Sequence, residues 1–309
     1  MSANDTPANT HPMLSLKVQV PLWICTLIWG TTWIVIRGQL GVVPVGWSIT
    51  YRFLIAGVAL FIYAAATKQP LQIGARGHRF AIVFGIAQFV LNFNFVYRAE
   101  AYVTSGLVAL VFALLLIPNT ILARLFLGTK VTGQFLIGTG VAIVGIGLLF
   151  LKEYRDADVQ GNAVLIGIGL TLLGVMSAST ANVLQATDRA KALPMASMLA
   201  WAMLWGSGVN ALIATIYNGA PVVDMQPSYI AGVLYLGIAA SAIAFMAYFS
   251  VIRMIGPGPA AYSGIATPVI AMMFSTAYEN YHWTLLAAAG GVLAMAGLII
   301  ALTARKPST

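Results

Sequence analysis

The sequence predicts an all-α integral membrane protein with ten transmembrane helices, arranged as two five-helix inverted-topology repeats around a central cavity. Three observations predict it: the composition, the long apolar runs, and glycines and prolines that recur about 150 residues apart. Of the 309 residues, 60% are hydrophobic and only 8% are charged, whereas soluble domains contain roughly 25% charged residues. This composition excludes a soluble enzyme, a disordered chain and a peripheral membrane protein.

Ten apolar runs are long enough to cross a bilayer, which requires about 20 helical residues. Arg52 is the only charge well inside a run. The predicted spans are residues 18–36, 46–66, 80–97, 104–125, 131–151, 163–185, 195–217, 229–252, 259–278 and 283–303. The runs are continuous, so they do not fit a membrane β-barrel, whose strands alternate in polarity over about ten residues.

Lysine and arginine are distributed unevenly between the two sides of these spans. With the N-terminus inside, eleven lie on the inner side and four on the outer side. Because cytoplasmic loops are enriched in these residues, we expect a bacterial inner-membrane protein with both termini in the cytoplasm. The expected organisation is a tail at 1–17, repeats at 18–155 and 156–303, and a tail at 304–309.

The chain contains signs of an internal repeat. Pro118 and Pro268 lie in similar contexts 150 residues apart, and three pairs of glycines have nearly the same offset: Gly140 with Gly290, Gly147 with Gly297, and Gly85 with Gly237. Each half has five spans, an odd number, so the second half enters the membrane in the opposite orientation, and substrate sites are expected near the midplane. The alternative is chance coincidence in helices rich in both residue types.

Several short motifs resemble the EamA domain of the drug/metabolite transporter superfamily, over about residues 18–303. They are Trp29-Gly30 in the first span, Pro44 followed by Arg52, the two prolines Pro118 and Pro268, and the glycine-rich fifth and tenth spans. The chain is most similar to ten-helix exporters of amino acids, including aromatic ones. The halves differ: Glu279 fits a glutamate common before the last helix, but the first half has Thr129 and Lys130 there.

Polar and aromatic side chains within the spans are the candidates for substrate binding, because a polar group in hydrocarbon is costly unless it has a partner or faces a wet cavity. Hydrogen bonding and packing between helices remain the alternative for many of them. The predicted substrate-binding residues are Trp29, Thr32, Trp33, Gln88, Asn92, Tyr97, Asn119, Ser179, Asn182, Tyr248 and Tyr262.

Prolines and glycines inside or between spans are candidate hinges. Pro118 and Pro268 each remove a backbone hydrogen bond and kink their helices, while Gly256 and Gly258 belong to a Gly-Pro-Gly-Pro break. A static bend is the alternative to a moving hinge. For Arg52 we favour a structural role over binding of a substrate carboxylate.

These features predict an alternating-access exporter of small amphipathic metabolites, including aromatic amino acids, with no cofactor, no metal and no nucleic-acid partner. The partners expected are the substrate and the lipid bilayer, for a monomer or homodimer. No Asp or Glu lies deep in a span, so we expect no mid-membrane carboxylate relay. Alternatives are a drug, sugar-phosphate or nucleotide-precursor carrier, a non-transporting sensor, and a membrane enzyme, which the scattered histidines do not favour.

Overall fold

The computed structural model describes residues 15–156, 161–261 and 263–303, and every regular element in these ranges is helical. The first half contains α1 (Leu16–Arg37), α2 (Val45–Ala66), α3 (Gly74–Gly85), η2 (Ile86–Leu91), α4 (Asn92–Ala99), α5 (Ser105–Phe112), η3 (Ala113–Leu115), α6 (Leu116–Leu127) and α7 (Gly133–Asp156). The second contains α8 (Gly161–Gln185), α9 (Asp188–Lys191), α10 (Met195–Asn218), α11 (Pro227–Gly237), η4 (Ile238–Ile243), α12 (Ala244–Ile255), α13 (Pro257–Ala260), α14 (Ser263–Tyr278) and α15 (Leu285–Leu302).

Each predicted span falls on helix, and seven helical segments of the described chain are long and apolar enough to cross a membrane. They are Leu16–Arg37, Val45–Ala66, Gly74–Ala99, Ser105–Leu127, Asn162–Gln185, Met195–Asn218 and Pro227–Ile255. The other three expected spans correspond to α14, with 16 residues, and to the shorter apolar stretches Gly133–Leu149 and Leu285–Ala301. The chain is therefore a multi-helix membrane protein, and a total of ten spans stays a prediction.

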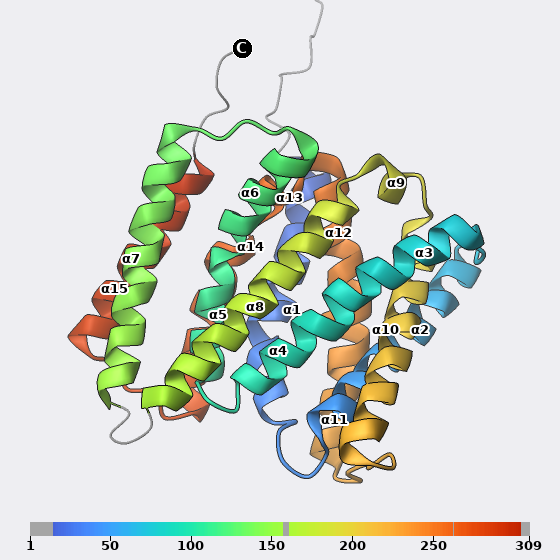
Figure 1. Ribbon diagram of the computed structural model, residues 1–309, viewed down its shortest axis with the longest axis horizontal. Helices are drawn as coiled ribbons and strands as arrows, with labels where there is room; N and C mark the ends of the chain where they lie inside the picture. The colour runs from blue at the N-terminus through green and yellow to red at the C-terminus, as the bar shows by residue number, and fades with distance from the viewer. Residues whose placement is uncertain (1–14, 157–160, 262, 304–309) are drawn as a thin grey trace, which may run out of the picture.

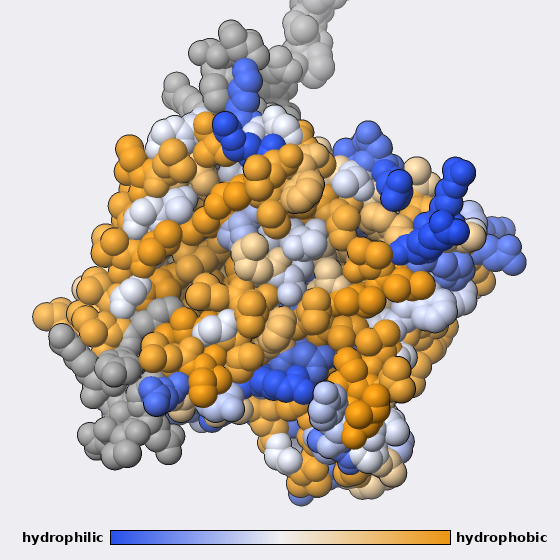
Figure 2. All heavy atoms as spheres, viewed as in Figure 1, coloured by the Kyte–Doolittle hydropathy of each residue, from blue (hydrophilic) through white to orange (hydrophobic). Residues whose placement is uncertain are grey.

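The helices form a bundle in which α7 and α15 pair along one edge (Figure 1). The face seen in Figure 2 is largely apolar across the middle, and most of its strongly hydrophilic residues lie toward the two ends, as expected for helices in lipid. Helices α7 and α15 pack closely because glycines face each other's backbone: a Cβ added at Gly145 would lie 2.6 Å from the carbonyl oxygen of Gly290 and 2.8 Å from Cα of Ala294. Small residues allow such contacts in membrane helices.

Two spanning helices change to π-helical geometry at matching places. Segment η2 follows Gly85 and η4 follows Gly237, 152 residues later. Both glycines lie where another helix passes: a Cβ at Gly85 would be 2.5 Å from the oxygen of Ala202, and one at Gly237 would be 2.8 Å from Cγ2 of Ile55. Single π-helical turns often occur at functional sites; η2 lines the cavity described below, and η4 is hydrogen-bonded to two residues that line it.

The core between the halves is a cluster of phenylalanine rings. Phe53 of α2 and Phe89 of η2 have centroids 4.8 Å apart, and Phe89 meets Phe245 of α12 at 5.4 Å in a T-shaped arrangement. Phe84 and Phe249 extend the cluster. Edge-to-face ring packing adds to the gain from burial, so this cluster holds α2, η2 and α12 together beside the cavity.

We predict that Gly145→Ala destabilises the protein by about 1–3 kcal/mol, because the added methyl group has to push α7 away from α15. Thermal unfolding in detergent measures the effect. Gly147→Ala is the matched control, since no atom lies within 4 Å of a Cβ at Gly147 and alanine favours helix over glycine. Equal melting temperatures for the two variants would contradict the packing described here.

Candidate functional site

A central cavity of about 110 Å³ lies between α1, α2, η2, α4, α5, η3, α8, α12 and α14. Small-molecule sites usually have volumes of roughly 300–1,000 Å³, so the cavity in this structure is smaller than a typical metabolite site. Seven of the eleven predicted substrate-binding residues line it: Trp29, Thr32, Trp33, Gln88, Asn92, Asn182 and Tyr248. Arg52 and Pro268 line it as well.

The other four predicted residues are placed differently. The hydroxyl of Tyr97 is buried and accepts a hydrogen bond from Arg52 at 3.4 Å. Asn119 accepts a hydrogen bond from Asn182 at 3.3 Å and donates one to the oxygen of Pro257 at 3.3 Å. Ser179 is buried away from the cavity lining, and Tyr262 lies outside the described residues.

Three cavity-lining residues carry buried polar atoms with no hydrogen-bond partner in the described part of the chain. These atoms are Nε1 of Trp33, Oε1 of Gln88 and Oδ1 of Asn92. An unsatisfied buried polar group costs about 1–3 kcal/mol. The indole is a donor only, whereas the two amides supply both donors and acceptors, so the cavity offers uncommitted groups of both kinds.

Aromatic rings form much of the remaining wall. Trp29 packs edge-on against Phe245 at 5.3 Å and Tyr248 at 4.9 Å, and its Nε1 donates to the oxygen of Ala240 in η4 at 3.1 Å. Trp33 packs against Phe112 at 5.2 Å. Phe112 and Phe245 also line the cavity but were not among the predicted residues, because isolated phenylalanines in apolar spans give no sequence signal that separates a cavity wall from lipid-facing surface.

Arg52 is only 1% exposed, and its guanidinium is held from three sides. Its Nε donates to the hydroxyl of Ser241 at 2.9 Å and its Nη1 to the hydroxyl of Tyr97 at 3.4 Å. Its Cζ lies 4.4 Å from the ring centre of Phe93, a cation–π distance. Arg52 therefore connects α2 to α4 and η4 and places one positive charge in the cavity wall.

The candidate hinge residues coincide with irregular backbone. Pro118 cannot donate to the oxygen of Leu114, and the 3₁₀ segment η3 occupies residues 113–115 immediately before α6. Pro268 lies inside α14. Gly256 ends α12 with φ of +87°, a conformation that favours glycine, and Gly258 lies in the short α13 that follows.

Comparison with known proteins identifies the family to which the chain belongs. The EamA-like transporter family matches residues 21–151 and residues 165–303. The chain belongs to the EamA-like transporter family.

Two of the following three relatives of this EamA-like transporter, YedA and YoaV, are named as transporters. The chain is 27% identical to the uncharacterized inner membrane transporter YedA of Escherichia coli K12, over 82% of this chain and 80% of YedA. It is 21% identical to the uncharacterized transporter YoaV of Bacillus subtilis, over 92% and 96%, and 24% identical to protein PagO of Salmonella typhimurium, over 87% of each. A solved crystal structure has the same fold, with a TM-score of 0.67, 18% identity, and coverage of 92% and 96%.

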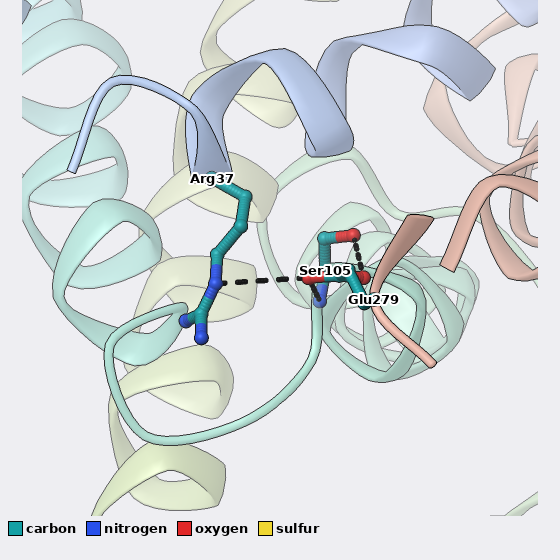
Figure 3. Close-up of polar contacts among 3 residues, drawn as sticks. All are labelled: Arg37, Ser105 and Glu279. Atoms are coloured by element: carbon teal, nitrogen blue, oxygen red, sulfur yellow. Dashed lines mark hydrogen bonds and ion pairs between the residues drawn. The ribbon is translucent and has the colours of Figure 1, made fainter. Parts of the chain in front are cut away.

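One end of this EamA-like transporter is fastened by a contact between three helices, which we call the Glu279 latch: Arg37, Ser105 and Glu279 (Figure 3). Oε1 of Glu279 accepts from the amide of Ser105 at 3.2 Å, and Ser105 Oγ lies 2.5 Å from Oε2. Arg37 Nε lies 3.7 Å from Oε1. Glu279 at the end of α14 is thus bound to the N-terminus of α5, where a negative charge is favoured, and to the end of α1.

A different contact ties the opposite end. Arg253, near the end of α12, donates to the oxygen of Leu193 at 3.0 Å and to Oε1 of Gln185 at 3.2 Å. The same end is also connected by Trp201, whose Nε1 donates to the oxygen of Leu71 at 2.9 Å. The cavity therefore lies between two ends with separate sets of polar contacts.

We predict that Glu279→Gln loosens the Glu279 latch and increases access to the cavity from that end about five- to tenfold. The variant keeps the size of the side chain but weakens a hydrogen bond to a charged group, worth about 1.5–3 kcal/mol, and an ion pair worth about 0–1 kcal/mol. The measurement is the rate at which a thiol reagent modifies Ile36→Cys, a buried cavity-lining position, in a Cys25→Ala background.

Asp224→Asn is the control for this prediction. Asp224 accepts a hydrogen bond within its own loop, from the amide of Gln226 at 3.0 Å, so its replacement should leave the modification rate unchanged. Equal rates for Glu279→Gln and the unsubstituted protein would show that the latch does not limit access.

Proposed function

We propose that this transporter exports small amphipathic metabolites, in particular amino acids including aromatic ones, across the bacterial inner membrane by alternating access. The observation that carries the proposal is the set of uncommitted polar atoms of Trp33, Gln88 and Asn92 in an otherwise aromatic and aliphatic cavity. A substrate with one polar head and one apolar side chain satisfies both kinds of wall. Such pairing is the general character of small-molecule sites.

The ammonium and carboxylate groups of an amino acid both find complementary groups in the cavity wall. An ammonium group carries only donors, which the amide oxygens of Gln88 and Asn92 can accept. A carboxylate is attracted to the single guanidinium of Arg52 in the wall. An aromatic or aliphatic side chain packs against the rings of Trp29, Phe112 and Phe245, in the edge-on geometries that such rings favour.

The proposal includes ten spans in two inverted halves, with both termini in the cytoplasm. Matching π-helical segments 152 residues apart support the repeat, and so do the two family matches in succession. The packing of the helices also supports the repeat. The first helix of the first half, α1, packs on α12 and η4 of the second half, and the first helix of the second half, α8, packs on the equivalent α4 and η2 of the first half. The inner-membrane assignment is supported by the name of the relative YedA and by the distribution of Lys and Arg.

A phosphorylated cargo is the alternative that the cavity favours least. Phosphate groups are bound by clusters of Arg and Lys, and Arg52 is the one basic residue in the cavity lining of the described chain. An uncharged drug would fit the aromatic walls but would leave the polar atoms unsatisfied.

Transport into proteoliposomes tests the proposal. Protein is reconstituted with unlabelled phenylalanine inside, and accumulation of labelled phenylalanine, tryptophan and leucine is compared with that of glucose 6-phosphate and a nucleotide. We expect the amino acids to exchange and the phosphates to remain outside. Exchange of the phosphates alone would overturn the proposal that amino acids are the substrates. If no solute moves, the result would favour a non-transporting sensor.

We predict that Gln88→Leu raises the KM for amino-acid exchange about tenfold with little change in stability. The substitution removes an acceptor for a charged ammonium group, and such bonds contribute about 1.5–3 kcal/mol. Gln134→Leu is the matched control, because Gln134 lies exposed on α7, away from the cavity. An unchanged KM in the Gln88→Leu variant would show that Gln88 does not bind the substrate.

A further inference from the structure

Glu100 is a buried acid that the proposed transport cycle does not use. It directly follows α4, it has no exposed surface, and neither carboxylate oxygen has a hydrogen-bond partner among the described residues. An ionised carboxylate in such surroundings carries a desolvation penalty so large that the group takes up a proton instead. The placement of Glu100 therefore favours its neutral form.

The charged groups around Glu100 come from four elements. Glu279, after α14, repels its negative charge, whereas Arg37 of α1 and Arg52 of α2 attract it; Tyr97 of α4 also interacts with it. Both arginines have other partners: Arg37 is paired with Glu279, and Arg52 donates to Ser241 and Tyr97. Burial, then Glu279, raise the pKa of Glu100 well above its ordinary value, and the arginines offset this only in part.

Glu100 caps the C-terminal end of α4, a helix that supplies part of the polar wall of the cavity. Gln88, Asn92 and Val96 line the cavity, and Glu100 is the next residue in this series at intervals of four, which places it close to the same helix face. Glu279, its acidic neighbour, belongs to the Glu279 latch. Glu100 therefore interacts both with Arg52 in the cavity wall and with Arg37 and Glu279 of the latch.

We propose that Glu100 is a proton-binding site whose occupation allows this end of the cavity to close. This inference rests on the proposed function, because opening and closing of this end are steps of alternating access. When the end opens, water hydrates Glu100 and the proton leaves to the same side from which it came. The proton is bound and released as H⁺ at one carboxylate oxygen, so the site regulates closure and carries no net proton across the membrane.

The sign of the pH dependence follows from the two forms. In the open form a hydrated Glu100 has a pKa near the ordinary value of about 4.3, and in the closed form it is raised. Below the open-form pKa the acid is neutral in both forms and has no effect on the equilibrium. Above it, each pH unit shifts the equilibrium toward the open form by up to about tenfold, until the closed-form pKa is passed.

Access to the cavity measures this shift without any substrate. The reporter is Ile36→Cys in a Cys25→Ala background, in sealed vesicles of known orientation, with a membrane-impermeant methanethiosulfonate added on the Glu100 side between pH 5 and 8. The rate with Glu100 present is divided by the rate with Glu100→Gln at each pH, because this ratio cancels the ionisation of the thiol. We expect the ratio to rise at least threefold per pH unit over part of this range.

Two controls make the result decisive. Asp224→Asn, an acid at a loop outside the cluster, should keep the full pH response. If Glu100→Gln does not fold, the rate in the protein with Glu100 is divided by the rate after denaturation in SDS, and the same rise is expected. A flat ratio between pH 5 and 8 overturns the proposal, as does loss of the response in Asp224→Asn. Either failure leaves amino-acid exchange, and thus the proposed function, unaffected.

Discussion

Polar groups within a bilayer have to be satisfied by the protein itself or by what enters its cavity, and this constraint governs the whole molecule. Most of its buried polar side chains comply with it. Arg52 is paired with Ser241 and Tyr97, and Asn210 of α10 donates to the oxygens of Phe89 and Gly206. The exceptions that line the cavity are in Trp33, Gln88 and Asn92, and these are the groups that the proposed substrate would satisfy.

Irregular helix geometry is found at the same places. Segment η2 supplies Gln88 to the cavity wall, and η4 supplies Ser241 to Arg52, a residue of that wall. Backbone that departs from the α-helix is tolerated at membrane depth only where protein or a wet cavity satisfies it. Trp29 does so for Ala240 by donating from its indole, and this bond joins the first helix of one half to the eighth predicted span in the other.

Sequence reasoning located the helices well because twenty-residue apolar runs in a weakly charged chain leave few alternatives. It also selected most of the polar cavity lining, since an amide such as Gln88 in an apolar span is rare and costly. It did not foresee Phe112 or Phe245, which look like ordinary lipid-facing residues. It did not predict the burial of Glu100, and the charged residues that interact with Glu100, which are Arg37, Arg52 and Glu279, are distant in the sequence.

The role of Arg52 shows a second limit of the sequence. The expectation of a structural role rested on the resemblance of the second span to the EamA domain, and the bonds of Arg52 to Tyr97 and Ser241 agree with a residue that holds helices together. Those partners lie 45 and 189 residues away, so no local pattern could have named them. The same guanidinium lines the cavity, which lets one residue both fix the wall and attract a carboxylate.

Protection of a cavity thiol by substrate tests the central claim most directly. Ala178 is buried and lines the cavity, so Ala178→Cys in a Cys25→Ala background reports whether a solute occupies it. The account predicts that phenylalanine or tryptophan slows modification of this thiol in a saturable way, while glucose 6-phosphate does not. Protection by the phosphate and none by either amino acid would contradict it.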